Sequence, residues 1–123
     1  MILSQKDLAK QHYLIGLNCL AIAKKRRFQD KALIQMACQY FLTAIQYDTT
    51  APDPYVKLGY VLGVFKGYRR AILYLKKALE LAPQHGEAKQ LYAYIHKKVK
   101  DSPARTERSH PFPPPSSKER VQA

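Results

Sequence analysis

Cysteine is scarce in this chain of 123 residues, and that scarcity excludes two classes of small protein. The two cysteines, Cys19 and Cys38, are too few for a framework of disulfides. They also fail to complete a zinc site, because tetrahedral zinc needs four ligands and the four histidines are scattered along the chain. We therefore expect two reduced, buried cysteines, no bound metal and no cofactor.

Long hydrophobic runs are also lacking. The longest, residues 13–23 and 58–65, fall well short of the roughly 20 residues that a membrane-spanning helix needs. The first run follows two lysines and ends in a small-x-small pattern, as an export signal does. Asp7, Asn18 and the four basic residues directly after the run argue against that interpretation. We expect a cytoplasmic protein without a transmembrane segment.

Acidic residues are few: nine stand against 21 lysines and arginines, which gives a net charge of +12. Residues 1–100 hold 17 of the basic residues and six of the acidic ones, so the excess lies in the part of the chain that is expected to fold. Such a charge favours acidic protein surfaces, nucleic acid or anionic membranes as partners, and it does not choose among them.

The composition changes at residue 101. Residues 101–123 contain five of the eight prolines and almost no periodic apolar residues, which predicts a disordered tail. Residues 1–100 have apolar residues at spacings of three and four throughout, which predicts one all-α domain. We place its helices at about 5–23, 30–48, 53–66, 69–82 and 86–100.

Local signals support these boundaries. Asp53 followed by Pro54 is a typical helix start, because the carboxylate caps the first turn and proline there loses no hydrogen bond. Gly67 lies in a short connection between two predicted helices, where we expect a positive φ. The segment 24–31, rich in basic residues, is expected to separate the first two helices.

The sequence repeats with a period of 34 residues. The aligned pairs are Ala37 with Ala71, Tyr40 with Tyr74, Phe41 with Leu75, Ala44 with Ala78, Ile45 with Leu79, and Tyr60 with Tyr94. This period is typical of paired-helix repeats. The chain here resembles the tetratricopeptide repeat family, whose signature positions are filled by Tyr55, Leu58, Gly59, Leu62, Gly67, Ala71, Leu75, Ala78 and Pro83.

The resemblance is strong for residues 52–85 and weaker on either side. Upstream, Ile15 and Gly16 take the Leu-Gly position only if about nine extra residues separate the helices. Downstream, residues 86–100 continue the pattern as one capping helix. The resemblance thus implies an α-solenoid of about five helices. About two and a half repeats is close to the minimum for stability, so a homodimer formed through an open end remains an alternative.

In this family the first helix of each pair lines a concave groove that binds partner segments. The resemblance places the groove at Tyr13, Leu17, Val56, Lys57, Tyr60, Gly63, Val64, Leu91, Tyr94 and Lys97. Tyr60 and Tyr94 are the best candidates, since tyrosine offers a large contact area and a polar end; the alternative is that they only pack between repeats. Gly63 is expected to leave room for a bound chain.

Two clusters of basic residues are expected at the turns, along one edge of the array. This basic rim consists of Lys24, Lys25, Arg26, Arg27, Lys66, Arg69 and Arg70. It suits an acidic protein, RNA or a lipid surface.

No set of residues suited to catalysis, whether an acid/base pair, a nucleophile with its base or a phosphate loop, is evident, so we expect a protein that is not an enzyme. The first hypothesis is an adaptor or assembly factor that binds an acidic protein partner in the groove. The alternatives are a nucleic-acid-binding protein that uses the basic rim, and an assembly or secretion chaperone.

Overall fold

The computed structural model describes residues 3–101, and within them the chain forms five α-helices. They are α1 (Gln5–Lys25), α2 (Lys31–Tyr47), α3 (Asp53–Val64), α4 (Tyr68–Leu81) and α5 (Gly86–Asp101). The all-α prediction is confirmed, and every predicted helix end lies within two residues of the observed one. Of the predicted tail, Asp101 ends α5 and the remaining residues lie outside the described part of the chain.

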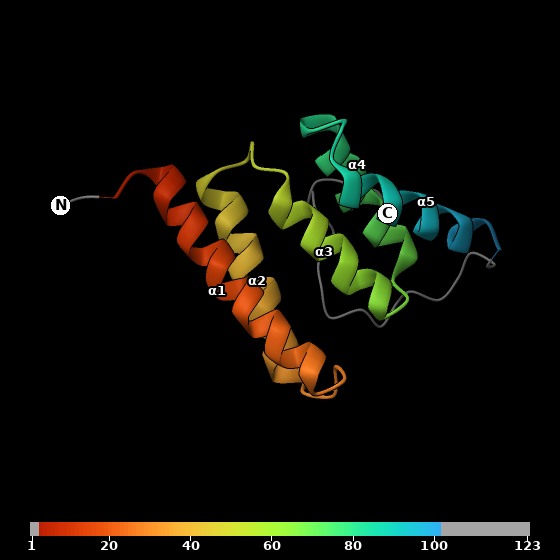
Figure 1. Cartoon of the computed structure of the whole chain (residues 1–123), viewed down its shortest axis with the longest axis horizontal. Helices are drawn as coiled ribbons and strands as arrows, with labels where there is room; N and C mark the ends of the chain where they lie inside the picture. The colour runs from red at the N-terminus through yellow and green to blue at the C-terminus, as the bar shows by residue number, and fades with distance from the viewer. Residues whose placement is uncertain (1–2, 102–123) are drawn as a thin grey trace, which may run out of the picture. The chain divides into compact units, whose positions relative to one another are not determined.

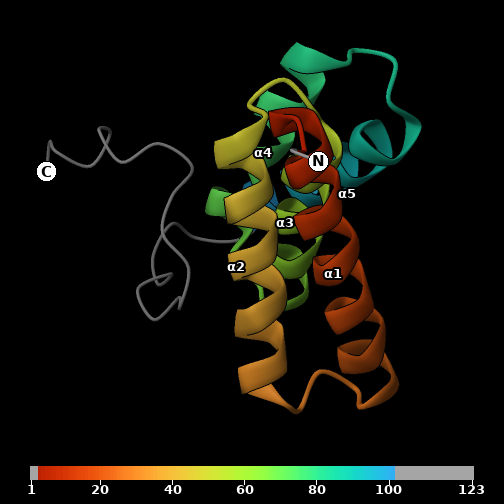
Figure 2. The same ribbon diagram turned by 90° about the vertical axis from the view of Figure 1, so that its left-hand side faces the viewer.

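The chain divides into two compact units, Met1–Pro54 and Tyr55–Ala123. In the first unit, α1 and α2 lie side by side as an antiparallel hairpin (Figures 1 and 2). Each helix begins at a capping side chain: Ser4 accepts a hydrogen bond from the backbone N–H of Asp7 at 3.1 Å, and Asp30 accepts one from Leu33 at 3.2 Å. These caps satisfy donors that the first turn of a helix leaves unpaired.

A glycine brings α1 and α2 close together. A Cβ atom added to Gly16 would lie 2.8 Å from Cε1 of Phe41, which is closer than real side chains approach. Phe41 is fully buried, and Ala23, Ile34 and Ala37 complete the same core. The absence of a side chain at Gly16 therefore makes room for an aromatic ring between the helices.

The second unit consists of most of α3 followed by α4 and α5. A Cβ added to Gly59 of α3 would lie 2.7 Å from Cγ of Leu75 on α4, so this pair of helices also meets at a glycine. The rings of Tyr55 and Tyr74 pack beside this contact, with centroids 6.5 Å apart. Ala88 and Ile95 are the residues of α5 that are buried.

The expectation that Gly67 needs a positive φ is wrong. Gly67 has φ −84° and immediately precedes α4, whereas Lys66 has φ 66°. The N–H of Gly67 donates to the carbonyl of Leu62 at 2.8 Å, and that of Lys66 donates to Gly63 at 3.0 Å. These two bonds form a Schellman motif, which requires the left-handed residue one position before the glycine.

The turn after α1 has the same motif. The N–H of Phe28 donates to the carbonyl of Ala23 at 2.8 Å, that of Arg27 donates to Lys24 at 2.9 Å, and Arg27 has φ 55°. Both hairpins therefore hold a basic residue in a conformation that favours glycine. The predicted break at 24–31 is shorter than expected, because α1 continues to Lys25 before this motif ends it.

Candidate partner-binding surfaces

Helices α3 and α5 run in the same direction in the second unit. Lys57 near the start of α3 donates to Glu87 near the start of α5, with Nζ and Oε2 3.1 Å apart. Further along both helices, Gly63 meets Ile95. The surface formed by Lys57, Tyr60, Leu91 and Tyr94 on these helices is called the α3–α5 surface below.

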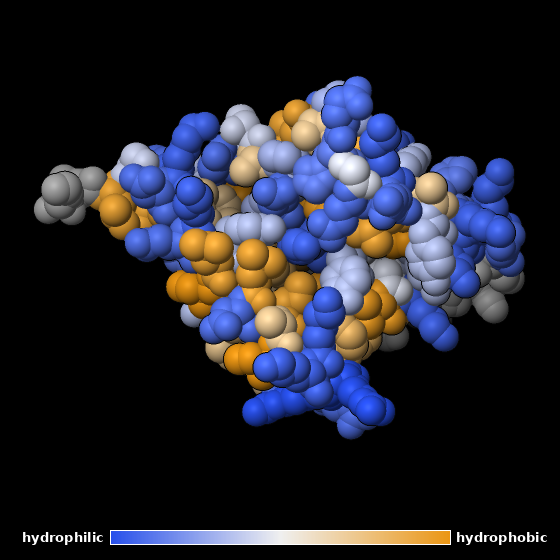
Figure 3. Space-filling model, viewed as in Figure 1, coloured by the Kyte–Doolittle hydropathy of each residue, from blue (hydrophilic) through white to orange (hydrophobic). Residues whose placement is uncertain are grey.

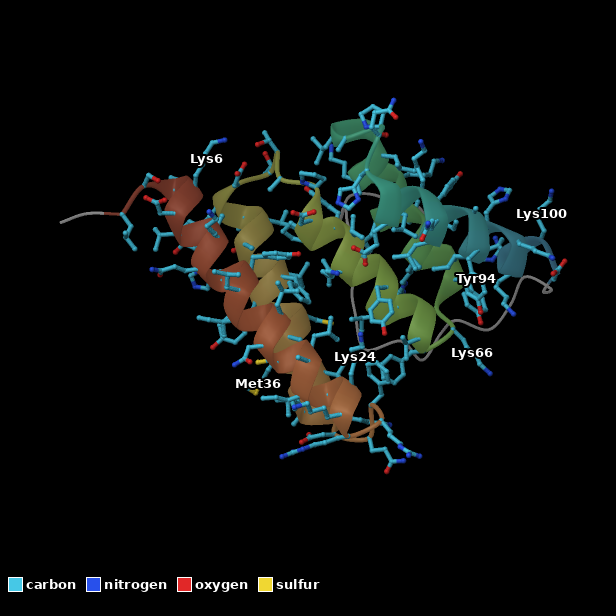
Figure 4. The ribbon with its side chains drawn as sticks, in the orientation of Figure 1. Lys6, Lys24, Met36, Lys66, Tyr94 and Lys100 are labelled. Atoms are coloured by element: carbon cyan, nitrogen blue, oxygen red, sulfur yellow. The ribbon has the colours of Figure 1, made fainter. Side chains whose placement is uncertain are left out.

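Tyr94 is the most exposed large side chain of this surface. Its side chain is 58% exposed, and Nζ of Lys98 lies 5.3 Å from the centroid of its ring. Lys97, which follows on the same helix, is also exposed. Figure 4 shows Tyr94 projecting from α5. A cation above a tyrosine ring and a second lysine close by form a surface with apolar area and positive charge together.

Two predicted groove residues have environments that differ from the expected ones. Val56 is fully buried, so it belongs to the core. A Cβ added to Gly63 would lie 2.8 Å from Cδ1 of Ile95, so the expectation that Gly63 leaves room for a bound chain is wrong. The space above Gly63 is filled by α5. Tyr60, Val64 and Leu91 are half-buried.

Lys57 has a different environment from the one expected of a cation at the edge of a groove. Its ammonium group is paired with Glu87, and its side chain is only 22% exposed. This ion pair joins α3 to α5. An acidic partner would have to compete with Glu87 for Lys57, whereas it would meet Lys97 on an exposed surface.

In the first unit, Tyr13 and Leu17 lie half-buried on α1. The ring of Tyr13 packs on Phe41, with centroids 5.7 Å apart, and it also lines a pocket of about 370 Å³. The walls of this Tyr13 pocket come from the start of α1 and from the segment that ends at Pro54. They are Lys6, Asp7, Ala9, Lys10, Tyr13, Leu14, Asp48, Ala51, Asp53 and Pro54.

Charged groups of both signs surround the Tyr13 pocket. Nζ of Lys6 lies 3.9 Å from Oδ2 of Asp48. The hydroxyl of Thr50 donates to the same aspartate at 2.6 Å and the N–H of Thr50 donates at 2.9 Å. These hydrogen bonds lower the pKa of Asp48, and the charge of Lys6 lowers it further. Sequence analysis did not predict this pocket. The pocket forms because residues 48–54 fold back onto α1, and no local pattern indicates that contact.

Each unit holds part of the predicted basic rim at its own turn. Lys24 and Lys25 end α1, and Arg26 and Arg27 begin the turn that follows. Nη1 of Arg26 pairs with Oδ2 of Asp30 at 2.9 Å. Lys66 projects from the turn after α3, as Figure 4 shows, and Arg69 and Arg70 lie in the first turn of α4.

The described residues offer little for metal or thiol chemistry. Within residues 3–101, no group of three or more His, Cys, Asp or Glu side chains is arranged to hold a metal ion. Cys19 and Cys38 are buried and unbridged, as expected from the sequence. Burial raises the pKa of the Cys38 thiol to about 12, so this sulfur stays protonated and is a poor nucleophile at neutral pH.

Comparison with known proteins adds no family. No protein-family model matches the chain, and no curated protein matches it. None of the helices in the described range has both the length and the hydrophobicity needed to cross a bilayer.

Proposed function

We propose that this protein is a non-catalytic adaptor or assembly factor of the tetratricopeptide type that binds an acidic protein segment. The observation that carries the proposal is Tyr94, more than half exposed on α5 beside Lys97 and Lys98. A partner segment with an apolar or aromatic side chain would pack on this ring. Its carboxylates would meet the lysines that flank it.

The packing of the helix pairs supports the repeat arrangement. Phe41 packs against Gly16, and Leu75 packs against Gly59. Phe41 and Leu75 are 34 residues apart, whereas the glycines are 43 apart. Longer helices account for most of this difference of nine residues, because α1 and α2 hold 21 and 17 residues, whereas α3 and α4 hold 12 and 14. The same contact thus recurs in both hairpins at positions that the repeat pattern pairs.

The parallel course of α3 and α5 also fits the proposal. Helices that occupy the first position of successive repeats run in the same direction in such arrays. Lys57 contacts Glu87 and, further along both helices, Gly63 contacts Ile95, so α3 and α5 run in the same direction. In the first unit, the Tyr13 pocket offers a separate site, where the apolar sides of Tyr13, Leu14 and Pro54 would take an aliphatic side chain.

The test is capture of partners on the immobilised full chain, comparing the wild type with Tyr94→Ala. Leu73→Ala is the matched control, since Leu73 is also a large exposed side chain, 42% exposed on α4. We expect protein partners that are lost with Tyr94→Ala and retained with Leu73→Ala. Truncation of such an exposed aromatic anchor lowers affinity by roughly tenfold or more.

Repeating the same experiment at increasing salt concentrations distinguishes the adaptor proposal from the alternative of nucleic-acid binding. RNA held by phosphate contacts at the basic turns would be released steeply as salt rises and would not depend on Tyr94. Retention of RNA with this behaviour, together with an unchanged set of proteins on Tyr94→Ala, would contradict the adaptor proposal.

A further inference from the structure

The hairpin of α1 and α2 presents a surface with unusually little charge. Nearly a quarter of the residues in the chain are charged, yet none lies in residues 11–23 of α1 or 32–47 of α2. Both stretches include exposed side chains. Here Met36 is exposed and Tyr40 and Tyr47 are half-buried, and depletion of charge combined with methionine and aromatic side chains is typical of the centre of a protein–protein interface.

One stripe of α1 has the spacing of a helix-pairing seam. Its residues alternate at intervals of three and four along the helix, and they are Leu8, Gln11, Ile15, Asn18, Ile22 and Lys25. Ile15 and Ile22 are 43% and 38% exposed. Intervals of this kind keep a seam facing a partner helix over several turns. We call these six residues the heptad stripe.

Neighbouring side chains extend the same face. Figure 3 shows hydrophobic residues exposed over α1, and Figure 4 shows Met36 of α2 beside it. Met36 is 47% exposed. His12 stacks on Tyr47, with ring centroids 5.3 Å apart, and lies 6.0 Å from Tyr40, so these rings continue the neutral surface between the helices.

The heptad stripe is complementary to itself when reversed. Its three aliphatic residues are spaced by seven, with Ile15 in the middle. If two copies of α1 lie antiparallel, Ile15 meets Ile15 of the second copy and Leu8 meets Ile22. Gln11 then lies beside Asn18, which pairs two amides across the contact.

The charges at the ends of the hairpin favour the same orientation. Around the turn, Lys24–Arg27 and Lys31 carry five positive charges against one from Asp30. At the other end of the hairpin, Asp7, Asp48 and Asp53 stand against two lysines. Antiparallel packing places the strongly basic end of one copy beside the end of the other at which acidic residues slightly outnumber lysines. Parallel packing would place the two basic turns together, at a cost in repulsion.

We infer that the heptad stripe and Met36 form the interface of an antiparallel homodimer. Its two-fold axis passes near Ile15, so this face is occupied by a second copy of the same chain. The inference does not depend on the proposed partner site, because Tyr94 lies in the second unit and the heptad stripe in the first.

Disulfide trapping of the full chain tests the orientation. Ile15→Cys is expected to form a covalent dimer on mild oxidation, since this position faces itself across the two-fold axis. Ile22→Cys alone should not do so, but it should cross-link when mixed with Leu8→Cys. The native cysteines are both buried, and the wild type serves as the blank. Cross-linking of Ile22→Cys to itself without cross-linking of Ile15→Cys would overturn the antiparallel dimer.

Sedimentation equilibrium tests the dimer without cross-linking. The wild type is expected to approach twice the 14.1 kDa mass of one chain at concentrations of about 100 μM, where a micromolar Kd would be saturated. Ile15→Lys should raise the dimer Kd at least about tenfold by burying a charge at the two-fold axis. Leu73→Lys, an equally exposed change on α4, should leave it unaltered. A wild-type chain that stays monomeric at this concentration would overturn the inference.

Discussion

Leu75 packs so closely against Gly59 that no side chain larger than that of glycine fits beside it. A Cβ atom on Gly59 would lie 2.7 Å from Cγ of Leu75 and 2.9 Å from its Cδ2. Both residues are buried, so the leucine has no solvent to move into. This contact sets how closely α3 and α4 pack, as Gly16 and Phe41 do for α1 and α2.

Gly59→Ala should therefore destabilise the protein. We expect the free energy of unfolding to fall by about 1–3 kcal/mol, because an added methyl group in a packed core forces neighbours out of place. Gly86→Ala is the matched control, since nothing lies within 4 Å of a Cβ added there. Urea denaturation of both variants checks the prediction, and equal stabilities would contradict it.

Lys66→Gly should stabilise the hairpin of α3 and α4. Lys66 has φ 66°, and glycine adopts this conformation without the steric penalty of a side chain. We expect the free energy of unfolding to rise by about 1 kcal/mol, the low end of the cost of holding a side chain in the left-handed region. Lys76→Gly, in the exposed middle of α4, should instead lower it by about 1 kcal/mol, because glycine is a poor helix former. Thermal unfolding of the two variants would show shifts of Tm in opposite directions.

The ion pair of Lys57 and Glu87 should couple α3 to α5. A double-mutant cycle with Lys57→Ala and Glu87→Ala is expected to give a coupling free energy of about 0.2–1 kcal/mol that declines as salt is added. Lys77 and Glu80 provide the comparison, since their atoms are 3.9 Å apart and both side chains are more exposed. That pair should show a smaller coupling. A coupling for Lys57 and Glu87 no larger than this would contradict the prediction.

Asp48 should contribute to acid sensitivity. The hydrogen bonds from Thr50 lower its pKa in the folded protein, so the unfolded chain binds the proton more tightly. The resulting stabilisation is present at neutral pH and is lost as the pH falls through the lowered pKa. Thr50→Val should raise the pKa of Asp48 toward its ordinary value, as measured by NMR titration of the carboxyl group. Thr49→Val, at the exposed neighbouring position, should leave it unchanged.

Several features of the fold could be predicted from local sequence because their causes are local. The spacing of apolar residues indicates all five helices, and Asp53 with Pro54 marks the start of α3. The 34-residue period pairs Phe41 with Leu75, and each of these side chains packs against a glycine. The expected burial of Cys19 and Cys38 is confirmed, because each lies on the apolar face of its helix.

The environment of the candidate site depended on contacts between distant segments. Ile95 occupies the space beside Gly63, Lys57 is paired with Glu87, and Val56 is buried. None of these environments follows from the positions of the three residues on α3 alone. The Tyr13 pocket exists because residues 48–54 return to α1.

The sequence by itself determined where the helices form, since capping and periodicity act over a few neighbouring residues. Only the tertiary structure decided which faces are open. Whether a side chain remains accessible depends on what packs against it from elsewhere in the chain. For that reason the space beside Gly63 is taken by Ile95, whereas Tyr94 on α5 and Ile15 on α1 remain exposed.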